Sequence, residues 1–349
     1  METILHLQGT SGSHLTPLML IHPISGLALP YLALGELSQD GQRPIYGINS
    51  PIYGRKPWHL PSSLDELAVA YVRLVQRIQP QGPYLLGGWS MGGMIALRMA
   101  AILEKANERI IHIVLIDSIN PDTVPPFRSA EEHQDLVSLT YNRLVENAGA
   151  LKRPSFARSS SSSSFLSDSD LSPTGKSQTH VTITEIPSLS DSSAGSSRWA
   201  SQVNLAKLKH LDGMPDQNYE EDDLSDDSDD SIYNPTANDQ VSQLEVLNRM
   251  SKHVADGLKL IADTSRSCLP ISISAPVTLF KCSVLEKLPS TMSELRRQAI
   301  RANFADERSG WKLPRLQTLS LKSAHDRVFD PEHVPELSFG LRALLVNCA

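Results

Sequence analysis

The sequence predicts an α/β fold in which a mainly parallel sheet carries helices on both of its faces. Short apolar runs typical of buried strands alternate along the chain with amphipathic runs typical of helices. Strands that alternate with helices are joined by crossovers, which make neighbouring strands parallel. Hydrophobic residues make up 40% of the 349 residues, so the chain can bury a large core. This length suits one large domain with an insertion, or two ordinary domains.

Four strands and two helices are expected before residue 128. The strands are the apolar runs at 18–22, 44–49, 84–88 and 110–117. The helix expected at 62–79 has apolar residues at helical spacing, with Ser62 or Ser63 as its N-cap and two acidic residues in its first turn. The second helix is expected from 91 to about 103, directly after a glycine-rich turn.

The composition changes in the middle of the chain. Residues from about 155 to 235 are rich in serine and acidic groups and poor in apolar ones. Such a segment buries too little surface to offset the entropy of ordering, so we expect a disordered loop. Helical patterns flank it at 131–151 and 241–263. The second pattern places one apolar stripe on its helix: Leu244, Leu247, Met250, Val254, Leu258 and Ile261.

The sheet resumes after this insertion. Strands are expected at 275–283 and 316–321, and a closing helix from about 331 to 345. The predicted organisation is therefore a core formed by 1–130 and 265–349, interrupted by a helical insertion over 131–264.

Charge and cysteine usage exclude several classes of protein. The formal net charge of −7 disfavours a surface that neutralises nucleic-acid phosphates. Three widely separated cysteines, Cys268, Cys282 and Cys348, form no CxxC or Cys/His cluster, so neither a disulfide framework nor a metal site is expected. No stretch approaches the ~18 apolar residues of a membrane span, and the N-terminus lacks a signal-peptide pattern. A cytoplasmic protein without a bound cofactor is expected.

One short motif indicates chemistry. Gly88-Trp89-Ser90-Met91-Gly92 matches the G-x-S-x-G nucleophile elbow of the α/β-hydrolase fold, and it follows an expected strand and precedes an expected helix. In such an elbow the serine sits on a strained turn that lifts its hydroxyl above the sheet. Ser90 is therefore the candidate nucleophile.

A serine hydroxyl needs a base to remove its proton. His325 follows the last expected strand, so its loop would carry it over the strand ends. His333 falls within the closing helix and His253 on an insertion helix, and we expect both at the surface. His325 is the candidate base.

The base needs an acid that orients its ring. Asp117 closes the strand that follows the elbow helix, and it is the favoured candidate. The next strand offers only Glu286, several residues too late. Asp326 is expected to point away from its neighbour His325 into solvent.

Backbone N–H groups are needed to bind an oxyanion. The residue after the nucleophile, Met91, supplies one, and Ile24 in "HPISG" is the best second donor because Pro23 has no N–H. Trp89 and Met94 lie near the elbow and are candidates for lining a substrate chamber.

Five segments together resemble the thioesterase domains of polyketide and nonribosomal peptide synthases, above all fungal ones. They are "LIHPISG", "PIYGINSP", "LDELAVAYVRLVQRIQPQGPYLLGGWSMGG", "IVLIDSINP" and "GWKLPRLQTLSLKSAHDRVF". The resemblance covers about 1–128 and 265–349. It implies that Ser90, His325 and Asp117 form a triad, with Met91 and Ile24 as oxyanion donors. It also implies a helical lid between the family's sixth and seventh strands, here about 131–263.

The resemblance implies a substrate and a partner as well. The acyl chain would arrive as a thioester on the phosphopantetheine arm of an acyl or peptidyl carrier protein, and the enzyme would hydrolyse or release it in secondary metabolism. The chain begins with Met and shows no ketosynthase, carrier or condensation segment, so a free-standing thioesterase is expected. The long Ser/Asp-rich loop departs from the family pattern.

Two other functions remain open at this point. A carboxylesterase or lipase would use the same triad on an oxoester. A non-catalytic module that binds carrier proteins would keep the fold without turnover.

Overall fold

The computed structural model describes residues 1–38, 40–54, 56–150, 238–268 and 271–348. The main unit comprises 1–144 and 230–349. A second unit spans 145–229, of which only 145–150, the end of one helix, are described. The Ser/Asp-rich segment that we expected as a disordered loop lies outside the described residues.

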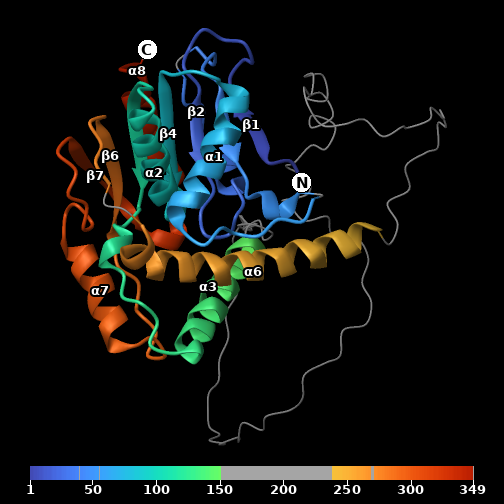
Figure 1. The fold of residues 1–349 in the computed structure, drawn as a ribbon, viewed down its shortest axis with the longest axis vertical. Helices are drawn as coiled ribbons and strands as arrows, with labels where there is room; N and C mark the ends of the chain where they lie inside the picture. The colour runs from blue at the N-terminus through green and yellow to red at the C-terminus, as the bar shows by residue number, and fades with distance from the viewer. Residues whose placement is uncertain (39, 55, 151–237, 269–270, 349) are drawn as a thin grey trace, which may run out of the picture. The chain divides into compact units, whose positions relative to one another are not determined.

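A seven-stranded sheet forms the centre of the main unit, in the order β1-β3-β2-β4-β5-β6-β7 (Figure 1). The strands are β1 (Ile4–Gln8), β2 (Leu18–Ile21), β3 (Ile45–Ile48), β4 (Tyr84–Trp89), β5 (Ile110–Ile116), β6 (Val277–Val284) and β7 (Leu316–Ala324). Only β1 is antiparallel to its neighbour, β3, and every other pairing is parallel. The mainly parallel sheet predicted from the sequence is confirmed. β1 was not predicted, because its side chains are all only half-buried at the edge of the sheet.

Helices cover both faces of the sheet. α1 (Leu64–Ile78) and α2 (Met91–Lys105) pack on one face, where their apolar side chains meet Met19, Leu86 and Leu115 of the strands. α8 (Val334–Val346) packs on the other face against Leu20, Val114 and Phe280. Ser63, one of the two expected caps of α1, accepts a hydrogen bond from the Glu66 N–H at 3.2 Å.

The parallel strands end at one edge of the sheet. Five of them are followed at once by polar residues: His22 after β2, Asn49 after β3, Ser90 after β4, Asp117 after β5 and His325 after β7. Ligands and reacting groups in open α/β sheets gather beyond the carboxyl ends of the strands. This edge is therefore where a site is expected.

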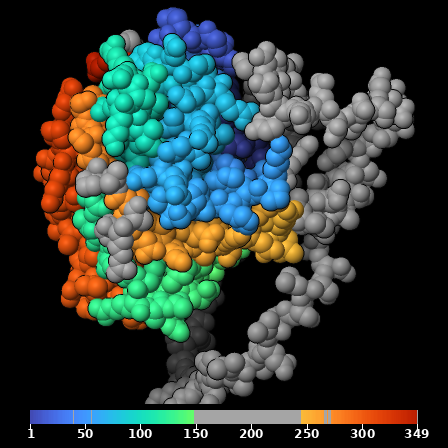
Figure 2. Space-filling view, viewed as in Figure 1, coloured from blue at the N-terminus to red at the C-terminus, as the bar shows by residue number. Residues whose placement is uncertain are grey.

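The insertion joins β5 to β6, the fifth and sixth strands of this sheet, and contributes two helices, α3 (Ala130–Ala150) and α6 (Asn238–Ser267). α6 contacts segments that follow β2, β3 and β5, so it runs across the carboxyl edge of the sheet. In Figure 2 it lies, in gold, between the blue N-terminal part of the core and α3 in green. The boundaries 131–264 of the insertion as a domain stay a prediction.

The apolar stripe predicted for α6 is wrong in its details. Val254 of the predicted stripe is fully buried, but Leu244 is 63% exposed, and His253, Gly257 and Thr264, which do not belong to the stripe, are buried. Polar residues share the contact face with apolar ones: Arg249 and His253 donate to backbone carbonyls of core loops, whereas Met250 and Leu260 pack in apolar clusters.

A further helix, α7 (Glu294–Ala305), was not predicted from the sequence either. Ser293 caps it by accepting from the Arg296 N–H, but its three arginines and few large apolar residues mask any apolar stripe. Within the part of the chain that the structure describes, no helix is long and apolar enough to cross a bilayer.

The packing of α8 generates a stability prediction. Leu341 is fully buried against the sheet, whereas Phe339 on the same helix is 76% exposed. Leu341→Ala should lower the free energy of unfolding by about 2–5 kcal/mol, through lost burial and the cavity left behind. Phe339→Ala, the matched control, should change it by less than about 0.5 kcal/mol. Urea denaturation measures both, and equal effects would contradict this orientation of α8.

Candidate active site

Ser90 lies on a sharp turn between β4 and α2. Its backbone has a φ of 56°, a left-handed conformation that costs a non-glycine residue free energy. The Ser90 N–H donates to the Ile116 carbonyl at 2.9 Å, which holds the turn against the neighbouring strand. A Cβ on Gly92 would lie 2.1 Å from the Ile21 carbonyl oxygen, so only glycine permits this close approach. The elbow expected from G-x-S-x-G is therefore present in the fold.

The side chains of Ser90, His325 and Asp117 form a continuous hydrogen-bonded chain. His325 Nδ1 lies 2.7 Å from Asp117 Oδ2, and His325 Nε2 lies 3.1 Å from Ser90 Oγ. A carboxylate only accepts, so His325 Nδ1 carries a proton and donates it to Asp117. In the neutral imidazole, Nε2 is then free to accept from the Ser90 hydroxyl. The structure brings together the three residues singled out in the sequence.

Hydrogen bonds hold both the backbone N–H and the carboxylate of Asp117 in place. Its N–H donates to the Phe280 carbonyl at 2.7 Å, and its Oδ1 accepts from the Cys282 N–H at 2.9 Å. Burial alone would raise the pKa of Asp117, but the hydrogen bond to His325, the charge of His325 and the Cys282 N–H together lower it below its ordinary value. The carboxyl is therefore ionised at neutral pH and can orient the imidazole.

His325 begins a short 3-10 helix, His325–Arg327, directly after β7. Burial would lower its pKa, but the hydrogen bond and the negative charge of Asp117 outweigh burial and raise the pKa to about 9. Its side chain is 42% exposed, so a substrate can reach it. The indole ring of Trp89 lies beside it, with ring centroids 5.4 Å apart.

The competing candidates for the acid make other contacts. Asp326 pairs with Arg143 of α3 at 2.9 Å, and Glu286 lies 3.7 Å from the same guanidinium. The expectation that Asp326 is simply solvated is therefore wrong. Its negative charge still raises the pKa of His325, while the Arg143 charge lowers it.

The two competing histidines also differ from expectation. His333 does not lie within the closing helix but at its N-cap, one residue before α8. His253, expected at the surface, is fully buried and donates from Nδ1 to the Ile24 carbonyl at 2.9 Å. Helical periodicity gave no sign of this contact, because the partner is a backbone carbonyl 229 residues away.

The two candidate oxyanion donors lie next to each other. Gly92, which follows Met91, packs on the carbonyls of Ile21 and His22 and so brings Met91 beside the loop that holds Ile24. Neither the Met91 N–H nor the Ile24 N–H donates to an acceptor among the described residues. An unpaired N–H on the residue after the serine and another on the facing loop suit the binding of a developing oxyanion.

The two candidates for the substrate chamber occupy different places. Trp89, 6% exposed, packs between His325 and Phe329. Met94, 4% exposed, packs in the core on the face covered by α1 and α2. Of the two, Trp89 is the one that touches a member of the Ser90, His325 and Asp117 chain.

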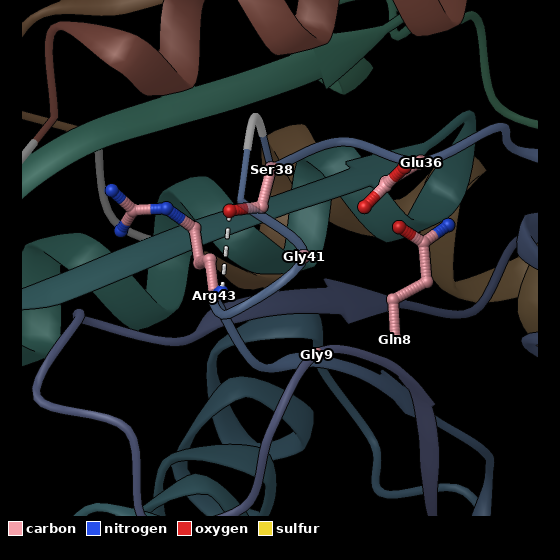
Figure 3. A pocket seen from close by; sticks show the side chains of 6 residues that line it. All are labelled: Gln8, Gly9, Glu36, Ser38, Gly41 and Arg43. Atoms are coloured by element: carbon pink, nitrogen blue, oxygen red, sulfur yellow. Dashed lines mark hydrogen bonds between the residues drawn. The ribbon is translucent and has the colours of Figure 1, made fainter.

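A pocket of about 340 Å³ lies at the opposite edge of the sheet, before the start of β3 (Figure 3). Its lining residues are Gln8, Gly9, Glu36, Ser38, Gly41 and Arg43. Both Gln8 and Arg43 hydrogen-bond to surrounding backbone carbonyls, so they tie loops together. Among the described residues, no group of three or more His, Cys, Asp or Glu side chains is placed to hold a metal ion.

Comparison with known proteins identifies the family. The model of the thioesterase domain matches residues 16–161. Thioesterase pytI of Aspergillus terreus is 34% identical over 99% of both chains, and the non-reducing polyketide synthase PKS12 of Gibberella zeae is 38% identical over 34% of this chain and 6% of its own. Among solved structures, a covalent complex of the NocB thioesterase domain with a fluorophosphonate nocardicin G analogue has a TM-score of 0.52 at 21% identity, covering 98% of this chain and 99% of that one.

The fold agrees with that of the NocB thioesterase domain, and the sequence aligns over 99% of both chains with thioesterase pytI. The chain has an α/β-hydrolase fold and belongs to the thioesterase family of polyketide and nonribosomal peptide synthases.

Proposed function

We propose that the protein is a serine thioesterase that takes an acyl chain from a carrier-protein thioester and releases it through an acyl-enzyme intermediate. The observation that carries this proposal is the continuous chain of hydrogen bonds from Asp117 through His325 to Ser90, in a member of a thioesterase family. Ser90 would be the nucleophile, His325 the general base and acid, and Asp117 the orienting acid.

In the first half of the reaction, Ser90 Oγ attacks the thioester carbonyl carbon while His325 Nε2 takes the hydroxyl proton. The carbonyl oxygen becomes an oxyanion, which the Met91 and Ile24 N–H groups would stabilise. When the carbon–sulfur bond breaks, the imidazolium returns its proton to the leaving thiolate. The products of this step are a Ser90 ester and a free thiol.

In the second half, His325 activates the acceptor that attacks the ester. Water gives a carboxylic acid, while a hydroxyl or amine of the acyl chain gives a ring. The proton passes from the acceptor to His325 and then to Ser90 Oγ, which restores the enzyme. No external oxidant or bound metal is required for either half.

The proposed thioester substrate indicates which protein would deliver it. Acyl chains in synthases are carried on phosphopantetheine, and the similarity to a polyketide synthase supports a carrier protein as the donor. We propose an acyl or peptidyl carrier protein as the partner, with synthesis of secondary metabolites as the context.

The first prediction concerns the nucleophile. Ser90→Ala should abolish turnover of an acetyl- or octanoyl-pantetheine thioester, because it removes the hydroxyl that hydrogen-bonds to His325 Nε2. Release of free thiol, followed with a thiol reagent, measures the loss. The melting temperature should stay the same, since no core contact is changed.

The same assay separates the competing functions. A thioesterase should turn over the acyl-pantetheine with a higher kcat/KM than the p-nitrophenyl ester of the same acid. A preference for the oxoester would favour a carboxylesterase. Turnover of neither, together with failure of Ser90 to react with a fluorophosphonate, would favour a non-catalytic module.

The second prediction concerns pH. His325 must be neutral to accept a proton, so kcat/KM should rise with pH and level off above the His325 pKa, which is raised from the ordinary 6.5 towards about 9. Asp117→Asn removes the main raising contact, so the pKa should fall, and kcat should drop by about 10⁴-fold through loss of the correct tautomer. NMR titration of the imidazole measures the pKa in both proteins.

Asp326→Asn is the matched control. It removes a nearby negative charge that does not orient the ring, so the His325 pKa should fall by less and kcat should change little. Equal losses of kcat in the two variants would mean that neither carboxyl alone orients the ring. This result would contradict the proposed role of Asp117.

A further inference from the structure

The loop that follows β2, residues 22–26, is held through its carbonyl groups. Each carbonyl from 23 to 26 accepts a hydrogen bond: Pro23 from His22 Nδ1 at 2.7 Å and the Gly26 N–H at 2.9 Å, Ile24 from His253 Nδ1 at 2.9 Å, Ser25 from the Tyr53 hydroxyl at 2.5 Å, and Gly26 from the Ser50 N–H at 2.8 Å. All of these donors belong to the first 53 residues except His253, which belongs to α6. One of the contacts that fix this loop therefore comes from the insertion.

Two histidines hold the two peptide groups on either side of Ile24. Carbonyl oxygens only accept, so Nδ1 of both His22 and His253 carries a proton. The Pro23 carbonyl and the Ile24 N–H belong to one planar trans peptide and point in opposite directions, so holding the carbonyl aims the N–H. The bond from His253 fixes the next peptide group. Together the two bonds restrain both backbone torsions at Ile24.

His253 is kept in a single hydrogen-bonding state. Burial lowers its pKa to about 4, and burial lowers that of His22 to about 3, so both rings are neutral at working pH. The two rings are perpendicular, with centroids 5.0 Å apart. A Cβ on Gly26 would lie 2.9 Å from His253 Cδ2, so the loop backbone packs directly on the ring.

Packing alone does not explain why a histidine is buried at position 253. His253 Nε2 is buried and has no hydrogen-bond partner among the described residues, which costs free energy relative to a hydrated nitrogen. An apolar ring of similar size would avoid this cost. What the histidine adds over an apolar ring is the Nδ1–H that reaches the Ile24 carbonyl.

The contact belongs to one face of α6. Arg249, His253 and Gly257 are spaced four residues apart, so they lie on the same side of the helix. Arg249 donates to the Ile52 and Gly54 carbonyls at 2.8 and 2.7 Å. A Cβ on Gly257 would lie 2.7 Å from Ile24 Cδ1 and 3.2 Å from Met91 Sδ, so this helix turn rests on the side chains of both candidate oxyanion donors.

We propose that His253 is a positioning residue for the oxyanion hole, and that α6 must lie on the loop at 22–26 for the Ile24 N–H to be held in place. This proposal rests on the proposed function of Ser90. The insertion then contributes to catalysis, because its packing on the core holds one of the two N–H groups that stabilise the oxyanion. Contacts that act only on the developing oxyanion change kcat rather than KM.

The test compares two substitutions of the same side chain. His253→Phe keeps the ring but removes the N–H, whereas His253→Asn places an amide N–H near the position of Nδ1. For an acetyl- or octanoyl-pantetheine thioester, His253→Phe should lower kcat by about 10- to 100-fold, less than the loss of an oxyanion donor itself, with KM almost unchanged. His253→Asn should retain most of the kcat. The melting temperature of His253→Phe should change little, because the unpaired Nε2 is removed while the Ile24 carbonyl loses its donor.

Val254→Ala serves as the matched control. Val254 is the next residue of α6 and is fully buried, so its truncation should lower the melting temperature while leaving kcat within about twofold. If His253→Phe does not fold, His253→Leu takes its place.

The proposal is overturned if the apolar variant keeps the full kcat, or if His253→Asn loses as much kcat as the apolar variant does. The proposed function is judged separately, from wild type against Ser90→Ala on the same thioester. A wild type without Ser90-dependent turnover would overturn both, whereas Ser90-dependent turnover with an unchanged His253→Phe would overturn only the role of His253.

Discussion

The site depends on where the parallel strands end. Ser90 and Asp117 follow β4 and β5, which are paired so that Trp89 lies opposite Ile116. His325 follows β7, two strands further along the sheet, and lies 208 residues from Asp117 in the chain. Because these strands are parallel and in register, the three side chains meet at one edge without any long loop to bring them together. A shift in the register of either β5 or β7 would separate them.

The close approach of backbone at the elbow is the second constraint. Gly92 packs on the carbonyls that end β2, and this contact places the turn at Ser90 beside the loop at 22–26. The left-handed backbone at Ser90 costs free energy, which the hydrogen bond to Ile116 and the surrounding core offset. The same contact therefore sets both the position of the nucleophile and the distance between the two candidate oxyanion donors.

Much of this arrangement was predictable from the sequence, because the motif and the strand pattern are local signals. G-x-S-x-G fixes the elbow, and Asp117 and His325 each follow an apolar run, so their location at the strand ends could be predicted. β1 and α7 were missed because a half-buried edge strand and an arginine-rich helix show little hydrophobic periodicity. The buried face of α6 was predicted incorrectly for a related reason. Arg249 and His253 on its contact face donate to backbone carbonyls, and Gly257 packs on the side chains of Ile24 and Met91, contacts that a pattern of apolar residues does not indicate.

Ser90 as the residue that becomes acylated is the claim on which the mechanism, the partner and the role of α6 all depend. Rapid mixing with an octanoyl-pantetheine thioester, an acid quench and peptide mass spectrometry would detect the intermediate directly. The account predicts one octanoyl group, bound as an ester on the peptide that contains Ser90. Thiol release by the intact enzyme with the acyl group on another residue, or with no acyl-enzyme formed under conditions that trap such esters, would contradict it.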